Sequence, residues 1–348
     1  MSIPQPIFPN TRLSRAVLPV LAVGSVCLPG VTPAMALATG ILAKTILGNP
    51  YGKQVGPWAT KVQTAALVGL GAGMKLDKVI QAGVSGVGFT ACSILGTLAL
   101  GHALGKFLHG ERIDKDQRFL LDVGTAICGG SAINAVAKAK GISPDDPKSS
   151  VAMGIVFALN GVGLYLFPEI GHQLHMLAHD FGVWVAFAAH DTSSVVGAAQ
   201  VYDPDSVQTA VVLKSARAFW IMPLALWVSF LKSRQDSPHM VKLPTLSDIK
   251  ISDIKMVCKK VWEVTPGFIP AFLGAALLVN YVPSIHSLGE IAFDSSKRAM
   301  VLMLFLVGTK MSVQDFAKVG LRPLAHGSLL WFIVGGLSLA AVQMGLVE

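Results

Sequence analysis

Two short stretches of this sequence place polar side chains and glycines in otherwise apolar surroundings. The first is GTAICGGSAINA at positions 124–135, and the second is AAHDTSSVVGAA at positions 188–199. Non-helical backbone at membrane depth is tolerated only where protein or a water-filled cavity satisfies its polar groups. The two stretches therefore predict two helix breaks that line a polar site inside an apolar protein.

The chemistry of the first stretch is that of an anion site. Two adjacent glycines permit an unwound turn, and Ser131 can cap the half-helix that follows. The N–H groups at such a helix start carry roughly half a positive charge. The alternative is that the glycines only allow close helix packing. The residues assigned to this half of the site are Thr125, Cys128, Gly129, Gly130, Ser131 and Asn134.

The second stretch has the same design with a titratable pair. Asp191, Thr192 or Ser193 can cap the next helix, and Ser194 belongs to the same substrate-binding turn. His190 and Asp191 could relay a proton or couple an ion, since histidine titrates near neutral pH. The alternative is that Asp191 is a helix cap and His190 its hydrogen-bonded structural partner.

Fixed positive charge follows in VVLKSARAFW. Lys214 and Arg217 are three residues apart, hence on one helical face. In a span that begins near 207, they lie about 10 to 15 Å deep at 1.5 Å per residue. Charge at that depth is costly and usually functional, so both are predicted to balance a bound anion. Snorkelling toward the interface is the alternative.

Composition identifies an integral membrane protein. Of 348 residues, 52% are hydrophobic and 14% charged, whereas about 25% of a soluble domain is charged. The formal charge of +8 comes from short loops between apolar spans, which fits membrane topology and not nucleic-acid binding. The four cysteines show no CxxC spacing, so neither a disulfide frame nor a zinc site is indicated. No metal and no cofactor are expected.

Apolar stretches near the roughly 20 residues that a membrane-crossing helix needs recur along the chain. They lie near 16–30, 31–48, 60–75, 79–105, 148–168, 207–231, 263–282, 285–308 and 320–346, with interrupted segments at 118–139 and 172–201. The predicted fold is an all-α polytopic membrane protein of about nine to eleven transmembrane segments. Two of these are broken or re-entrant half-helix segments.

An internal repeat organises these segments. PAMALATGIL matches PAFLGAALLV, and GAGMKLDKVIQAG matches GTKMSVQDFAKVG, both at an offset of 237. A second internal similarity, at an offset of 60, relates KGISPDDPKSSVAM to QVYDPDSVQTAVVL. Internal repeats that flank broken helices are typical of secondary transporters, which predicts inverted repeats here.

The repeat divides the chain into predicted units. They are an N-terminal segment with the first helix (1–30), a first scaffold panel (31–107), a core transport domain (108–231), a basic linker (232–262) and a second panel (263–348). The N-terminus also resembles a signal peptide, but PAMA belongs to the repeat. The linker is expected to be an amphipathic helix on the inner membrane surface, or otherwise a solvated connector.

Loop charges set the orientation. If both interrupted segments re-enter, the lysines after the first one lie inside with the other basic loops, as the positive-inside rule favours. This reading also restores the inverted symmetry, and broken helices that cross fully are the alternative. The N-terminus is then cytoplasmic and the C-terminus outside, in a bacterial inner membrane.

Together, GTAICGGSAINA and HDTSSVVGAA, followed by lysine and arginine in the next span, resemble the YeiH-type family of conserved bacterial membrane proteins described as sulfate exporters. The resemblance covers essentially the whole chain. It implies a multi-span transporter, distantly similar in plan to bile-acid and sodium symporters. Relatives are expected to read closer to HDVAQVVGAA, so the hydroxyl-rich version leaves open a different ion or coupling.

The function expected from the sequence is alternating-access transport of a small anion such as sulfate, sulfite or a sulfonate. Coupling to H⁺ or Na⁺ is left open, no enzymatic activity is expected, and the chain could form a homodimer. One alternative is a sodium-coupled organic-anion symporter. A remote alternative is an intramembrane hydrolase that uses Ser131 or Cys128 with His190.

Overall fold

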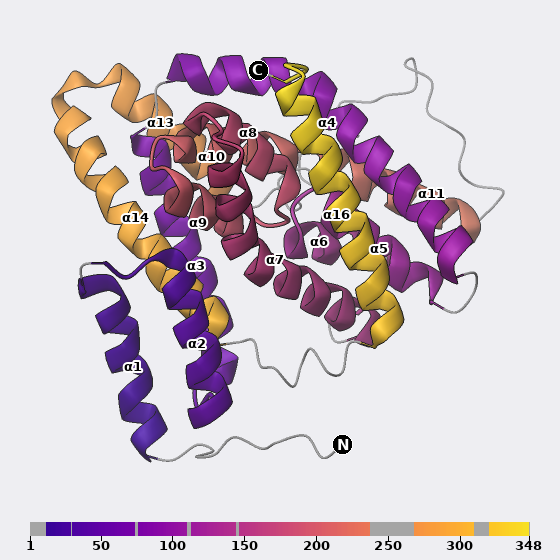
Figure 1. Ribbon diagram of the computed structural model, residues 1–348, viewed down its shortest axis with the longest axis horizontal. Coiled ribbons are helices and arrows are strands. Elements are labelled where there is room, and N and C mark those ends of the chain that lie inside the picture. Colours follow the sequence, from indigo (N-terminus) through magenta and orange to yellow (C-terminus); the bar gives the residue numbers. More distant parts are fainter. Residues whose placement is uncertain are drawn as a thin grey trace.

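The computed structural model describes residues 12–28, 30–73, 76–109, 113–143, 146–236, 268–309 and 320–347. Every regular element within these ranges is helical (Figure 1), which confirms the all-α prediction. Two segments that the sequence singled out fall outside them: most of the basic linker, from residue 237 on, and residues 310–319 of the repeat.

The N-terminal third forms long helices. They are α1 (Arg12–Cys27), α2 (Pro33–Leu47), α3 (Gly52–Ala72) and α4 (Leu76–Leu104), with a π-helical turn η1 (Gly105–His109). The start of α2 shows how sequence sets a boundary. The Thr32 hydroxyl accepts a hydrogen bond from the Met35 amide at 3.2 Å, and Pro33 occupies the first turn, where its missing N–H costs nothing.

The middle of the chain forms shorter helices around two interruptions. They are α5 (Lys115–Ala126), α6 (Gly130–Lys140), α7 (Pro147–Gln173), α8 (Ala178–Ala188), α9 (Thr192–Tyr202), α10 (Ser206–Ala218) and α11 (Ile221–Asp236). Both polar stretches fall at helix breaks, between α5 and α6 and between α8 and α9. The C-terminal part comprises α13 (Phe268–Tyr281), a 3₁₀ turn η3 (Pro283–Ile285), α14 (His286–Gly308) and α16 (Leu321–Gln343).

Four helical stretches of the described chain are long and apolar enough to cross a membrane. They are Gly88–Phe107, Pro147–Gln173, Ser206–Arg234 and Leu321–Gln343, and a fifth is formed by Pro270–Tyr281 with Pro283–Gly308 if that pair, bent by 110°, is one span. Among the other helices, the 15 residues of α2 reach only about 22 Å, against a bilayer core of about 30 Å. The count of nine to eleven therefore stays a prediction.

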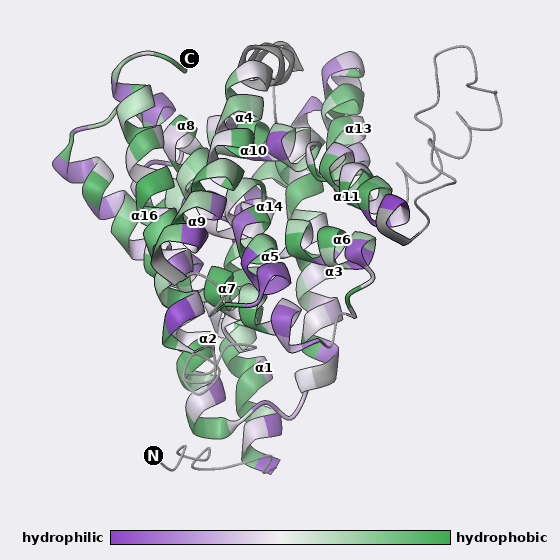
Figure 2. Ribbon diagram, turned by 90° about the vertical axis from the view of Figure 1, so that its right-hand side faces the viewer, coloured by the Kyte–Doolittle hydropathy of each residue, from purple (hydrophilic) through white to green (hydrophobic). Residues whose placement is uncertain are grey.

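Apolar residues dominate the helices on the outside as well as inside (Figure 2). Large hydrophobic side chains such as Val20, Leu95 and Leu337 are more than half exposed. An outer surface of this kind is unusual for a soluble monomer and suits contact with lipid.

The helices pack in two groups (Figure 1). In the first, α3 packs along α14, with α2 also on α14, α13 on α3, and α1 against α14 and α2. In the second, α5 packs on α7, α7 on α9, and α10 on both α8 and α9. The remaining long helices border the second group, since α4 packs on α5 and α10, and α16 on α8, α7 and α5.

A tight contact between α4 and α5 depends on Gly101. A Cβ atom at this position would lie 2.4 Å from the Cγ and Oδ1 atoms of Asp122 on α5. This carboxylate is also hydrogen-bonded to His326 of α16, so it has little freedom to move aside. The glycine therefore lets three helices meet around one buried carboxylate.

We expect Gly101→Ala to lower the free energy of unfolding by about 1–3 kcal/mol, because overpacking forces neighbouring atoms to shift. The matched control is Gly96→Ala on the same helix, where an added Cβ would meet nothing within 4 Å. Thermal unfolding of both variants in detergent measures the difference. Equal midpoints would contradict the packing account.

Candidate functional site

The first helix break depends on a left-handed glycine. After α5 ends at Ala126, Ile127 and Cys128 are buried, and Gly129 adopts φ 62° and ψ −128°. The Gly129 amide donates a hydrogen bond to the Gly124 carbonyl at 2.8 Å, which closes the turn. Any other residue would be strained at this φ.

The second break has a carboxylate cap. The Asp191 side chain accepts a hydrogen bond from the Ser194 amide at 2.9 Å, so α9 begins with a satisfied N-terminus. Asp191 thus occupies the helix-cap position that the sequence offered as one alternative. By contrast, the predicted Ser131 cap is wrong: α6 begins at Gly130 with Gly129 at the cap position, so Ser131 lies inside the helix and no side chain caps its first turn.

The two breaks lie against each other. A Cβ atom at Gly129 would lie 3.4 Å from the Cβ of His190 and 3.5 Å from the Cβ of Asp191. Across the same contact, the Thr125 hydroxyl lies 3.2 Å from His190 Nε2. The His190 amide in turn donates to the Asn160 side-chain carbonyl on α7 at 3.1 Å. Stretches some 60 residues apart in sequence therefore form one crossing.

Two fully buried cations from α10 hold this crossing together. Lys214 Nζ donates hydrogen bonds to the carbonyls of Ala186 at 3.2 Å and Ala189 at 2.7 Å. Both cations have 0% exposure, so snorkelling to the interface is excluded.

The Arg217 guanidinium connects the two breaks directly. Its Nη1 donates to Ala186 at 3.1 Å and Phe187 at 3.0 Å, while Nη2 donates to the Ala126 carbonyl on the other side of the crossing. The guanidinium also lies over the Phe187 ring, 4.8 Å from its centroid.

These contacts have a simple electrostatic cause. The last carbonyls of a helix have no intrahelical donor and carry partial negative charge. Lys214 and Arg217 supply donors to such carbonyls where α5 and α8 end. The sequence predicted cations that balance an anion, and it could not show that backbone carbonyls are their direct partners.

The sequence also missed aromatic and amide partners of the second break. Trp331 on α16 donates from Nε1 to the Ala188 carbonyl at 2.9 Å, and its ring stacks on that of His190 with centroids 6.2 Å apart. Together with Asn160, these residues fix His190. A single asparagine in the apolar helix α7 was the one signal that could have pointed to this role.

Among the described residues of the two breaks, exposure is concentrated on α6. Ser131 and Asn134 are exposed, and Gly130 and Asp191 are half-buried. The remaining predicted site residues are buried, namely Thr125, Cys128, Gly129, Thr192, Ser193 and Ser194. The accessible edge, which we call the α6 mouth, consists of Gly130, Ser131, Asn134 and Asp191.

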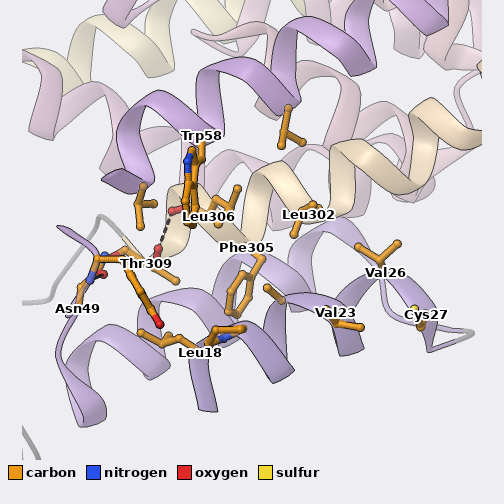
Figure 3. A pocket seen from close by; sticks show the side chains of 15 residues that line it. Leu18, Val23, Val26, Cys27, Asn49, Trp58, Leu302, Phe305, Leu306 and Thr309 are labelled. Carbon is orange, nitrogen blue, oxygen red and sulfur yellow. Dashed lines mark hydrogen bonds between the residues drawn. The ribbon is translucent and has the colours of Figure 1, made fainter. Parts of the chain in front are cut away.

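A large cavity lies elsewhere. Its volume is about 610 Å³, and residues of α1, α3 and α14 such as Leu18, Trp58 and Phe305 line it (Figure 3). None of its lining residues belongs to the predicted site.

The geometry also bears on the hydrolase alternative. A nucleophile needs its general base within hydrogen-bonding distance. His190 Nε2 instead contacts Thr125, and Cys128 is buried whereas Ser131 is exposed. The contacts of the crossing are those of a structural junction with one polar opening.

Comparison with known proteins places the chain in a family. The model of a family described as Conserved hypothetical protein 698 matches residues 20–327. The chain belongs to this family. The resemblance indicated by the two polar motifs is thereby confirmed.

Relatives in this family are named UPF0324 membrane proteins. One from Bdellovibrio bacteriovorus is 37% identical over 97% of both chains. One from Photobacterium profundum is 38% identical over 91% of this chain and 88% of its own, and one from Geobacter sulfurreducens is 35% identical over 91% and 92%. No solved structure matches. The chain is thus a membrane protein of a bacterial family, as its composition predicted.

We expect Gly129→Ala to destabilise the protein by about 1–3 kcal/mol, because a non-glycine residue at positive φ is strained and the added Cβ would lie 3.0 Å from Val156. Gly130→Ala is the matched control, since its nearest contact would be an ordinary 3.6 Å to Phe157. Unfolding midpoints in detergent compare them. A loss in Gly130→Ala as large as in Gly129→Ala would contradict the assignment of strain to one residue.

Proposed function

We propose that this membrane protein is a secondary transporter of a small anion, such as sulfate, sulfite or a sulfonate. The substrate binds at the α6 mouth, where the uncapped start of α6 offers N–H groups and Ser131 and Asn134 offer polar side chains. The observation that carries this proposal is the crossing itself: two helix breaks held together by two buried cations and open at one polar edge.

Charge balance supports an anionic substrate. Lys214 and Arg217 bring two positive charges to the crossing, and Asp191 brings one negative charge. These groups therefore sum to one positive charge in apolar surroundings. Uncompensated charge is costly there, and a bound anion beside the α6 N-terminus lowers that cost.

The packing supports inverted repeats and alternating access. At the offset of 237, α2, α3 and α4 correspond to α13, α14 and α16; at the offset of 60, α5 and α6 correspond to α8 and α9. Helix pairs then match: α2 packs on α14 as α13 packs on α3, and α4 packs on α5 as α16 packs on α8. We infer that the core moves against the two panels, as in transporters built from such repeats.

The membrane setting of this proposal follows the loop charges. The protein lies in the bacterial inner membrane with a cytoplasmic N-terminus and an external C-terminus, and both interrupted segments re-enter. The core, residues 108–231, carries the substrate, while the panels, 31–107 and 263–348, form the scaffold.

A sodium-coupled organic-anion symporter is the second candidate, because the half-buried Asp191 could hold a cation at the α6 mouth. The carbonyls that would complete a sodium site at the breaks are already hydrogen-bonded to Lys214 and Arg217. The protein's own cations thus occupy the position of a coupling ion, which favours transport without sodium.

Counterflow in proteoliposomes tests the substrate class. Vesicles preloaded with sulfate, sulfite, thiosulfate, a small sulfonate or a dicarboxylate should accumulate labelled sulfate by exchange, with and without a sodium gradient. Exchange with sulfur oxyanions supports the proposal. Uptake that occurs only with sodium and an organic anion would favour the second candidate.

We expect Arg217→Ala to lower the exchange rate about 30-fold or more while leaving membrane insertion intact, because truncating one partner of a buried charge contact costs about 2–5 kcal/mol. The matched control is Arg234→Ala, which removes an exposed arginine that lies over Phe230 on α11. Initial rates of labelled sulfate uptake compare the two. Full exchange by Arg217→Ala would contradict the role of its charge.

The sign of the charge at the α6 mouth tests whether the transported anion binds there. We expect Ser131→Asp to raise the KM for the anion at least about tenfold, since like charges in contact cost several kcal/mol. The position is exposed, and an acidic residue in a first helical turn is otherwise stabilising. Ser131→Asn is the neutral control. An unchanged KM in Ser131→Asp would show that the anion does not bind at the α6 mouth.

A further inference from the structure

A second polar pair lies buried beside the crossing, and the proposed substrate site does not use it. His326 Nε2 on α16 lies 2.7 Å from Asp122 Oδ1 on α5. The two side chains are 0% and 4% exposed. The contact joins a helix of the core to a helix of the second panel.

The Asp122 carboxylate is hydrogen-bonded to His326, and further charged groups surround it. The other groups that act electrostatically on its carboxylate are Arg118 on the same helix and His102 on α4. The helices α6 and α7 also pack on α5. Of their lysines, Lys140 and Lys148 pair with acidic residues at the start of α5, and Lys138 is exposed. From α4, Gly101 lies directly against the carboxylate, next to His102 in the chain.

Both members of the pair lie close, along their own helices, to residues of the crossing. Asp122 lies three residues before Thr125, about one helical turn away, and the Thr125 hydroxyl contacts His190. His326 lies on the same helix as Trp331, which donates to the Ala188 carbonyl at the second break. Both members are therefore connected through their own helices to opposite sides of the crossing.

Stability does not explain such a pair. Burying two ionisable groups costs several kcal/mol of desolvation, and apolar replacements are often equally stable or better. Ionisable residues inside membrane spans instead commonly mark ion or proton pathways. A carboxylate and an imidazole in contact form a simple proton-binding site.

We propose that the Asp122–His326 pair binds the proton that couples transport, an inference that rests on the proposed transport function. In one state a carboxylate faces a neutral imidazole, with a net charge of −1. Uptake of one proton onto the imidazole gives a neutral ion pair with a charge-assisted hydrogen bond. The proton comes from water on one side of the membrane and is released to water on the other.

Proton binding at this place changes the contact between core and panel. The protonated pair links α5 to α16 tightly, and loss of the proton leaves a weaker, neutral-donor hydrogen bond. Movement of the core against the panel is thereby tied to the protonation state. The sequence suggested His190 as the proton site. It lies close to the positive charges of Lys214 and Arg217, which disfavour adding a proton to its imidazole.

The test separates exchange from proton-driven accumulation. In Asp122→Asn, counterflow exchange of labelled sulfate should persist, because exchange needs no net proton movement, whereas accumulation driven by an imposed pH gradient should fall to the level seen without the gradient. Asp116→Asn is the matched control, since it removes an ion-paired carboxylate at the exposed start of the same helix. Proton-driven accumulation in Asp122→Asn equal to that of wild type would overturn the proposal.

A second measurement keeps the inference independent of the substrate. Infrared difference spectra of the purified protein between acidic and alkaline pH should contain carboxyl and imidazole bands that disappear in Asp122→Asn and in His326→Gln, and that remain in Asp116→Asn. Identical spectra in wild type and both pair variants would overturn the proposal, even if wild type exchanges no anion tested. A wild type that shows these bands but no exchange refutes the transport function and leaves the proton site standing.

Discussion

The structure depends on one constraint: a helix that breaks in apolar surroundings exposes carbonyl groups that no water can satisfy. Here the breaks between α5 and α6 and between α8 and α9 meet, and Lys214 and Arg217 donate to the carbonyls on both sides. Leaving such groups unpaired costs about 1–3 kcal/mol each. The crossing therefore exists because the cations of α10 reach it, and the cations are tolerated because the carbonyls receive them.

Several features follow from this mutual dependence. The helix C-termini face the cations, so the N-termini of α6 and α9 are left to face each other and the α6 mouth. The left-handed turn at Gly129 brings the first break within contact distance of His190 and Asp191, and Trp331 of α16 fixes the second break. A site with fixed positive charge, uncapped amides and one opening results, which is the chemistry of anion binding.

Sequence patterns predicted the helices and the positions of both breaks because apolar length and glycine content are local signals. The predicted stretch 207–231 corresponds to α10 and α11, and 118–139 and 172–201 contain the breaks. The partners of Lys214 and Arg217 could not be predicted, since carbonyl groups leave no trace in a sequence. The Asp122–His326 pair was missed for another reason: its members are 204 residues apart and neither lies in a glycine-rich motif.

The central claim, that the crossing binds an anion, is tested most directly by a crystal structure of the protein soaked in selenate, whose selenium atom is located by anomalous scattering. The account predicts a peak at the α6 mouth, within hydrogen-bonding reach of the Ser131 hydroxyl and the first amides of α6. A peak found only at other sites, with the α6 mouth empty at saturating selenate, would contradict it.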